Sequence, residues 1–379
     1  MKINKNIPEN PFSSATYLGK DFFCDRTEET QLLIRNIQNG NSTTLIAVRR
    51  IGKTGLIQHV LSHLPKNYKS IYIDILETEN LNQFLNLLAT SIVRAIPEKN
   101  STGRKFWNFI KALRPVIKFD ILTGEPIISF DIKYSEVETN INSVIEFLES
   151  QNFKVVIAID EFQQILNYPE KNTDAWLRSK IQQLKNIVFI FAGSEQHLMT
   201  ELFTSPKRPF FRSSHILKLK KIDKSVYRDF IISLFDKYGK IISSEIAEEI
   251  LTWANVHTFY VQQLCNRVFS FTKNAVTTEI WKKQAYLLLK EQENVFFACR
   301  NMLTNPQWNL LKAIAHEGNV FMPTAKEFLN QYQLGTSATV LRSLNTLIDY
   351  ELVYYDYDEN GRKYYSVYDV WFQRWIEIK

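Results

Sequence analysis

The stretch Thr44-Leu-Ile-Ala-Val-Arg-Arg-Ile-Gly-Lys-Thr-Gly-Leu-Ile57 decides the fold of this 379-residue chain. It opens with a run of apolar, β-type residues, continues through a short loop to Gly-Lys-Thr, and then repeats apolar residues at helical spacing. Strand, loop, Gly-Lys-Thr and helix in this order are typical of a phosphate-binding loop. We therefore predict a nucleotide-binding segment made of Ala47, Val48, Arg49, Arg50, Ile51, Gly52, Lys53, Thr54 and Gly55.

Each part of this segment has a physical reason to meet a phosphate group. Gly52 lets the backbone approach a phosphate oxygen closely, and the N–H groups at the start of a helix attract anions. Lys53 is a compact cation that can span the β- and γ-phosphates, and the Thr54 hydroxyl is placed to bind Mg²⁺. The usual pattern has glycine at the position of Ala47. Because alanine is the smallest substitute, we expect the loop to be intact.

Bulk composition places the chain among soluble globular proteins. Apolar residues make up 45% and charged residues 23% of the chain, and no apolar run approaches the ~20 residues that a membrane span needs. The length predicts two or three domains. The cysteines Cys24, Cys265 and Cys299 are odd in number and far apart, which favours reduced thiols and a cytoplasmic location.

The charge is unevenly distributed along the chain. The formal net charge is +6; residues 304–379 hold seven Lys/Arg and nine Asp/Glu, hence −2, which leaves +8 for residues 1–303. The basic character therefore belongs to the part with the phosphate-binding loop and not to the C-terminal part.

Strand and helix patterns alternate through the first 221 residues, as in an α/β protein. The strands expected to join the first one in a parallel sheet cover residues 70–76, 154–161, 186–194 and 216–219. Two β-type runs around Thr123-Gly-Glu-Pro126 predict a hairpin, which we interpret as an insertion at the edge of the main sheet over residues 115–133. We assign residues 1–221 to one P-loop nucleotide-binding domain.

Two of the predicted strands end in residues that could bind a metal ion or take part in catalysis. The run Lys154-Val-Val-Ile-Ala-Ile-Asp-Glu161 fits a strand buried on both faces, and it ends in two carboxylates at the edge where parallel strands place ligand groups. Asp160 could hold Mg²⁺ and Glu161 could polarise an attacking water; the alternative is a solvated acidic turn. Ser194 ends the strand over 186–194, where its hydroxyl could reach the γ-phosphate, cap the next helix, or do both.

A basic, proline-broken loop follows over residues 204–214. Arg208 and Arg212 are candidates for an arginine that touches the γ-phosphate from a neighbouring subunit, where a guanidinium stabilises charge on the transferred phosphoryl group. A solvated basic loop is an equally good interpretation for either arginine.

The strands stop after residue 221. Helical patterns over 224–237, 244–255, 258–272 and 277–302, the last of them broken or bent, predict an all-α lid domain over residues 222–302. Three helices and a β-hairpin then predict a winged helix-turn-helix domain over residues 303–379. Its third helix, Ser337 to Asp349, presents one cation, Arg342, and the module carries −2. Because phosphate attraction dominates DNA affinity, we interpret it as an interaction or packing module, with a protein partner expected, and a DNA role is possible but not favoured.

These features together resemble the STAND/AAA-type ATPases, in particular the archaeal-type ATPase family that is also common in Bacteroidetes. The resemblance covers nearly the whole chain. It is carried by Phe23-Cys-Asp-Arg26, Val48-Arg-Arg-Ile-Gly-Lys-Thr54, Ile157-Ala-Ile-Asp-Glu161, Ala192-Gly-Ser194, Ser205 to Arg212, and His257-Thr-Phe-Tyr-Val-Gln-Gln-Leu-Cys265, with Leu303-Thr-Asn-Pro-Gln-Trp-Asn-Leu-Leu311 and Tyr368-Asp-Val-Trp-Phe-Gln-Arg-Trp375 near the C-terminus.

The resemblance implies a RecA-like (ASCE) parallel sheet of order 5-1-4-3-2 that binds ATP and Mg²⁺, followed by the lid and the winged helix. Carried over by position, it implies phosphate and metal binding by Lys53 and Thr54, metal binding by Asp160, a catalytic base at Glu161 and a sensor at Ser194. It also places Arg26 near the nucleotide, and Arg212 stands where relatives carry an arginine in the loop after the sensor strand.

The chain departs from this family at two points. Ala47 replaces the first loop glycine. In the lid, relatives carry a Gly-Gly-His-Pro or Gly-x-Pro turn that touches the nucleotide; this chain has Asn255-Val-His-Thr258 and keeps His257.

Three hypotheses remain open at this stage. The first is a Mg-dependent, ATP-hydrolysing molecular switch whose lid and winged helix respond to ATP and ADP. The second is a nucleotide-binding scaffold without hydrolysis. The third is a DNA-acting initiator or regulator. A homo-oligomer is compatible with all three, and no membrane association is expected.

Overall fold

The structure is a computed structural model that describes residues 8–96, 98, 101–113, 115–131 and 133–379. Its internal contacts divide the chain into two compact units. The first unit comprises Gly19–Lys221, and the second comprises the residues up to Leu18 together with Ile222–Lys379. Among the described residues, every helix is too short or too polar to cross a lipid bilayer.

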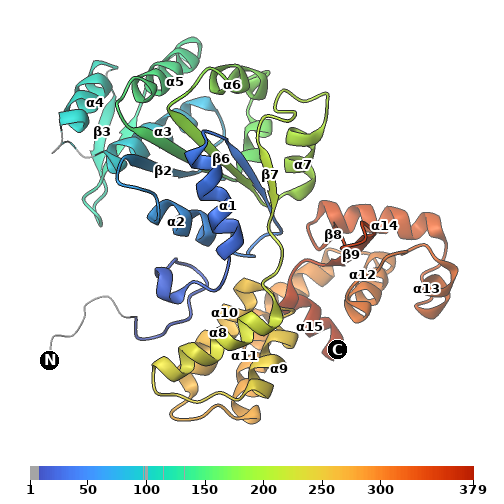
Figure 1. The fold of residues 1–379 in the computed structure, drawn as a ribbon. Helices are drawn as coiled ribbons and strands as arrows, with labels where there is room; N and C mark the ends of the chain where they lie inside the picture. Colours follow the sequence, from blue (N-terminus) through green and yellow to red (C-terminus); the bar gives the residue numbers. More distant parts are fainter. Residues whose placement is uncertain (1–7, 97, 99–100, 114, 132) are drawn as a thin grey trace. The chain divides into compact units, whose positions relative to one another are not determined.

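A five-stranded parallel sheet forms the centre of the first unit (Figure 1). Its order is β2-β5-β6-β1-β7, built from β2 (Tyr68–Asp74), β5 (Lys154–Asp160), β6 (Ile187–Gly193), β1 (Thr43–Ile46) and β7 (His215–Lys218). Counted without the inserted hairpin, these are the second, third, fourth, first and fifth strands. The predicted order 5-1-4-3-2 and the α/β P-loop fold class are therefore confirmed.

Helices cover both faces of this sheet because its central strands are apolar on both sides. Val155 and Ile157 of β5 face one core, and Val156 and Ala158 face the other. The second core is closed by α1 (Thr27–Gln38) and α2 (Lys53–Ser62). The first core is closed by α3 (Leu81–Ala95), α4 (Ser101–Ala112), α5 (Tyr134–Glu149), α6 (Thr173–Ile181), α7 (Gln196–Thr204) and the 3₁₀ helix η2 (Phe162–Asn167); a further 3₁₀ turn, η1, spans Lys20–Phe22.

The predicted hairpin forms, but it does not extend the main sheet. Strands β3 (Val116–Phe119) and β4 (Pro126–Ser129) make a separate antiparallel pair. Side chains of α3 bind its backbone: the Ile128 N–H donates to Thr90 Oγ1 at 2.9 Å, and the Phe130 N–H donates to Asn86 Oδ1 at 2.8 Å. These polar groups hold the insertion on α3 and not on strand β2, which corrects its predicted place. Position 132 of the predicted hairpin lies outside the described residues.

The second unit begins with a bundle of four helices. They are α8 (Lys224–Lys237), α9 (Ser244–Trp253), α10 (Thr258–Phe271) and α11 (Thr278–Asn301). The last of these predicted helices is not broken, because α11 runs as one helix of 24 residues. Its sequence contains neither proline nor glycine, and the Thr277 side chain caps its start.

Residues 8–18 pack on this bundle. They therefore do not belong to the first unit, although the predicted first domain begins at residue 1. The Phe12 ring lies 5.4 Å from that of Phe235, and Asn266 Nδ2 donates to the Phe12 carbonyl at 2.6 Å. Asn10 Nδ2 donates in turn to the Asn266 carbonyl at 2.8 Å. One buried aromatic ring and the hydrogen bonds around it therefore attach this segment to the second unit.

The C-terminal part is a winged helix. It contains α12 (Asn305–Glu317), α13 (Lys326–Gln331), α14 (Ser337–Asp349), β8 (Val353–Tyr357), β9 (Lys363–Val367) and α15 (Val370–Ile378). A single bridge pairs Val320 with Tyr365. The closing helix contacts the bundle: Trp371 Nε1 donates to Gln263 Oε1 at 2.6 Å, and Arg374 Nε donates to the Trp253 carbonyl at 2.8 Å. The winged helix and the bundle are thus parts of one unit.

The turn between α9 and α10 is strained. Asn255 and Val256 both have left-handed backbones, with φ of 52° and 50°. A β-branched residue rarely adopts this conformation, which costs an L-residue about 1–2 kcal/mol. We expect Val256→Gly to be more stable than Val256→Ala by about 1 kcal/mol, because both remove the side chain and only glycine relieves the strain. Urea unfolding of the two variants measures this difference, and equal midpoints would contradict it.

Candidate nucleotide-binding site

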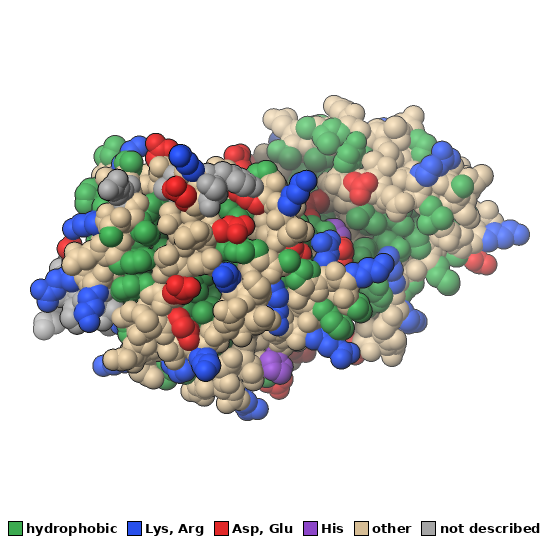
Figure 2. All heavy atoms as spheres, turned by 90° about the horizontal axis from the view of Figure 1, so that it is seen from above, with side chains coloured by type: hydrophobic (Ala, Val, Ile, Leu, Met, Phe, Trp, Pro, Cys, Tyr) green, Lys and Arg blue, Asp and Glu red, His purple; other side chains and the backbone are tan. Residues whose placement is uncertain are grey.

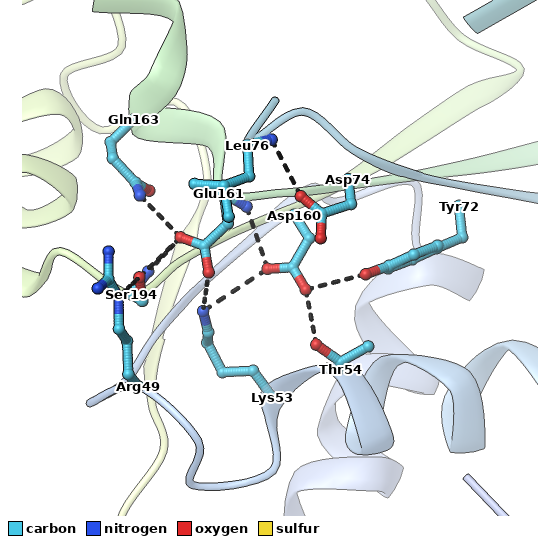
Figure 3. A network of polar contacts seen from close by, with 10 residues as sticks. All are labelled: Arg49, Lys53, Thr54, Tyr72, Asp74, Leu76, Asp160, Glu161, Gln163 and Ser194. Carbon is cyan, nitrogen blue, oxygen red and sulfur yellow. Dashed lines mark hydrogen bonds and ion pairs between the residues drawn. The ribbon is translucent and has the colours of Figure 1, made fainter. Parts of the chain in front are cut away.

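The site lies where three neighbouring strands of the first unit end (Figure 3). Asp160 is the last residue of β5, and Ser194 follows the last residue of β6. The phosphate-binding loop follows β1 and leads into α2. Because parallel strands end at the same edge of the sheet, these three segments bring their side chains together.

Lys53 lies between the two carboxylates. Its Nζ is 3.6 Å from Asp160 Oδ1 and 3.3 Å from Glu161 Oε1. Asp160 Oδ2 accepts a hydrogen bond of 2.8 Å from Thr54 Oγ1. The Lys53 side chain is 6% exposed and that of Asp160 is 3% exposed. Buried charges need partners of opposite sign, so these four residues form one interdependent cluster.

The second oxygen of Glu161 accepts three hydrogen bonds. Gln163 Nε2 donates at 2.7 Å, Ser194 N at 3.0 Å and Ser194 Oγ at 2.8 Å. Arg49 from the loop donates its Nε to Ser194 Oγ at 3.1 Å. Burial raises the pKa of Glu161, but the Lys53 charge and these hydrogen bonds outweigh burial and hold the pKa below its usual value. Glu161 is therefore ionised at neutral pH.

The loop before Lys53 has the backbone of a phosphate-binding turn. Gly52 precedes α2 with a φ of 102°, which glycine adopts without strain, and Arg50 has a φ of 63°. Lys53 and Thr54 are the first two residues of α2. The N–H groups of the first turn of a helix have no acceptor within that helix, so they can bind an anion. Ala47 is fully buried, and its methyl group packs in the core shared by the sheet, α1 and α2.

The donor set fits a magnesium ion. Thr54 Oγ1 and Asp160 Oδ2 are hard oxygen ligands of the type Mg²⁺ prefers, and they already lie within hydrogen-bonding distance of one another at 2.8 Å. Asp160 also provides the negative charge that such an ion needs. The same pair would hold the ion beside Lys53.

Three predicted residues lie outside this network. Arg26 is 4% exposed at the start of α1 and pairs with Glu29 at 2.9 Å. Arg212 is exposed, and its guanidinium lies 5.1 Å from the centre of the Phe211 ring. His257 belongs to the second unit, where it precedes α10 with its ring 4.9 Å from that of Tyr260. Their roles toward a nucleotide stay predictions.

Two segments of the chain match known families. Residues 23–264 match the family described as an ATPase domain predominantly from Archaea. The chain belongs to this family. Residues 294–378 match a family described as a probable winged helix domain. Comparison with the curated proteins gave no match.

Three solved structures share the fold of this chain. A Walker-type ATPase of Pyrococcus abyssi is 18% identical with a TM-score of 0.65, covering 95% of this chain and 97% of its own. The ORC2 protein of Aeropyrum pernix is 12% identical with a TM-score of 0.56, covering 100% and 96%. The ORC1 protein of the same organism, solved in complex with DNA, is 14% identical with a TM-score of 0.54, covering 97% and 96%. These likenesses concern the fold alone.

Two residues of this ATPase domain were missed from the sequence. Tyr72 of β2 donates its hydroxyl to Asp160 Oδ2 at 3.1 Å, and Gln163 contacts Glu161. Burial and the nearby charge of Asp160 raise the pKa of Tyr72, which keeps the hydroxyl a donor. The only sequence signal for Tyr72 is its place in a predicted strand two residues before Asp74. Gln163 had no signal beyond its closeness to Glu161.

Proposed function

We propose that this ATPase-family protein binds ATP with Mg²⁺ and hydrolyses it to ADP and phosphate. One observation carries the proposal: Lys53, Thr54, Asp160 and Glu161 lie in a single cluster at the carboxyl edge of the sheet, in which Lys53 and Asp160 are buried. A buried lysine held by two carboxylates is costly for a purely structural purpose, because desolvation offsets most of the attraction between the charges.

Binding of the triphosphate would use the loop backbone and Lys53. The N–H groups at the start of α2 and the Lys53 ammonium would hold the β- and γ-phosphates. Thr54 and Asp160 would hold Mg²⁺, which supplies positive charge against the phosphates. Lys53 would move from its carboxylate partners to the phosphates, exchanging one set of negative oxygens for another.

Hydrolysis would use Glu161 as the proton acceptor. The oxygen of a water molecule would bond to the γ-phosphorus, the bond from that phosphorus to the β–γ bridging oxygen would break, and the proton of the water would pass to Glu161. The low pKa of Glu161 keeps it ionised and able to accept this proton. Ser194, which donates two hydrogen bonds to Glu161, would hold the carboxylate beside the γ-phosphate.

Phosphate release from ATP tests this proposal. Purified protein should release phosphate with Mg²⁺ present and lose that activity when excess EDTA removes the metal. A slow rate of release would agree with the proposal. ATP binding without any release would contradict hydrolysis, and release that EDTA leaves unchanged would contradict the metal site.

The winged helix would present a surface to a protein partner as part of a STAND-type switch. On α14, Leu341 is 49% exposed beside Arg342, and the wing tip carries the exposed Glu359 and the half-buried Asp358, which pairs with Arg362 at 2.8 Å. An apolar residue on the recognition helix α14 and acidic groups at the wing tip disfavour binding to the phosphate backbone of DNA. Figure 2 shows one face of the whole molecule, on which basic and acidic side chains are interspersed. Duplex binding should be weak at low salt, whereas tight binding with a steep salt dependence would support a DNA role.

Arg212 would contribute to a nucleotide site in a neighbouring copy of the chain. Its exposed guanidinium is free of ion pairs among the described residues, whereas Arg208 pairs with Glu201 at 2.6 Å. Light scattering with ADP and with a non-hydrolysable ATP analogue tests this role. We expect a larger mass with the ATP analogue, and an unchanged monomer mass in both would rule out a contribution across subunits.

A further inference from the structure

We propose that Gln163 is a positioning residue for Glu161: its side-chain amide, enclosed by Gly193 and Met199, fixes the orientation of the Glu161 carboxylate. This inference rests on the proposed ATP hydrolysis. It adds a residue outside the phosphate-binding loop, the acidic pair and Ser194, and it explains the glycine at the end of β6.

The contacts of Glu161 define its orientation completely. Gln163 is 1% exposed, and its Nε2 donates to Glu161 Oε2 at 2.7 Å, the shortest of the three hydrogen bonds to that oxygen. The other oxygen, Oε1, faces Lys53 Nζ at 3.3 Å. The amide and Ser194 therefore hold one edge of the carboxylate, and the other edge is turned toward the lysine that would meet the phosphates (Figure 3).

The local backbone brings Gln163 back toward Glu161. Glu161 has a left-handed backbone with a φ of 54°, and η2 begins at the next residue. The Gln164 N–H donates to the Glu161 carbonyl at 2.9 Å, which closes this turn. A non-glycine residue in this conformation costs about 1–3 kcal/mol, and such strain gathers at functional sites. Here the strained turn places the amide two residues ahead beside the carboxylate.

Gly193 leaves the space that this amide occupies. A Cβ atom at position 193 would collide with Gln163 Oε1 and would lie 2.5 Å from Met199 Cγ and 2.6 Å from Met199 Sδ. Gly193 is an ordinary strand residue of β6, so its missing side chain, and not its backbone conformation, leaves room for the Gln163 amide and the Met199 side chain. A side chain at position 193 would make these two side chains shift.

The amide has a defined orientation that stability alone does not explain. Gln163 Oε1 is buried and has no hydrogen-bond partner among the described residues. Leaving such an acceptor unsatisfied costs about 1–3 kcal/mol. Turning the amide over would point Oε1 at the ionised Glu161, which is worse because two acceptors would then face one another. The hydrogen bond from Gln163 Nε2 to Glu161 therefore comes at the cost of leaving Gln163 Oε1 without a partner among the described residues.

Two matched variants test this role. Gln163→Met keeps the length of the side chain and removes the amide. Gln164→Met makes the same change at the neighbouring glutamine, whose Nε2 donates to the Thr78 carbonyl at 2.9 Å away from Glu161. We expect Gln163→Met to lower kcat about 10- to 100-fold with KM changed less than about threefold, because a misplaced base slows the chemical step. We expect Gln164→Met to leave kcat unchanged, and thermal melts confirm that both variants fold.

Single-turnover phosphate release separates positioning from a general loss of structure. At saturating ATP, Gln163→Met should slow the chemical step by the same factor as kcat, while its Kd for a non-hydrolysable ATP analogue stays within about threefold of the wild-type value. An unchanged kcat in a folded Gln163→Met enzyme, or an equal loss of kcat and of nucleotide binding, would overturn the inference while leaving the proposed function intact. If the wild-type protein itself does not hydrolyse ATP, the proposed function fails.

Discussion

Lys53→Ala should lower ATP turnover by at least about 1000-fold and weaken ATP binding strongly. Lys53 is the only cation whose ion pairs with both Asp160 and Glu161 are seen among the described residues. Its loss removes the charge expected at the β- and γ-phosphates, where the charge of the transition state develops. It also leaves the buried Asp160 beside the partly buried Glu161 without a cation between them. Calorimetric titration and single-turnover phosphate release measure the two effects, with exposed Lys66→Ala as the control.

The same variant should lose stability in a pH-dependent way. Removing one partner of a buried ion pair costs about 3–5 kcal/mol. The pKa of Glu161 is lowered in the folded protein, so its pairing stabilises the fold above the unfolded pKa and is lost as the pH falls through the folded value. The difference in unfolding free energy between wild type and Lys53→Ala should therefore be large at pH 7 and shrink toward pH 4. A constant difference over that range would contradict the pairing.

Glu161→Gln should retain ATP binding and lose turnover about 100- to 10,000-fold. The amide has the size of the carboxylate and cannot accept a proton from the attacking water. Removing a negative charge beside the phosphates should leave binding equal or tighter. Single-turnover kinetics with saturating ATP measures the chemical step, and Glu201→Gln, at an exposed partner of Arg208, serves as the control. Turnover within tenfold of wild type would exclude Glu161 as the base.

Much of the first unit follows from local sequence. The apolar run before Asp160 and the Gly-Lys-Thr turn before α2 each fix an element and one of its ends, because their patterns arise from burial and from backbone geometry. The resemblance to a family then supplied the strand order. With that order, Thr54 and Asp160 are expected at neighbouring strand ends, and their side chains lie 2.8 Å apart.

The remaining features depend on contacts that no local pattern records. Gln163 reaches Glu161 because Glu161 itself has a left-handed backbone. Sequence patterns do not predict this conformation for a glutamate. Tyr72 reaches Asp160 from the neighbouring strand β2, which is 88 residues away in the sequence, and Phe12 packs on a helix more than 200 residues away. The hairpin was placed at the sheet edge because β-type runs favour strand pairing, whereas polar side chains of α3, among them Asn86, bind it instead.

A crystal structure with a non-hydrolysable ATP analogue and Mg²⁺ tests the central claim most directly. We expect the triphosphate against the N–H groups of Gly52 to Thr54, Lys53 Nζ on the β- and γ-phosphates, and a metal ion in place of the hydrogen bond from Thr54 to Asp160. A nucleotide bound elsewhere, with Lys53 still paired to Asp160 and Glu161, would contradict it.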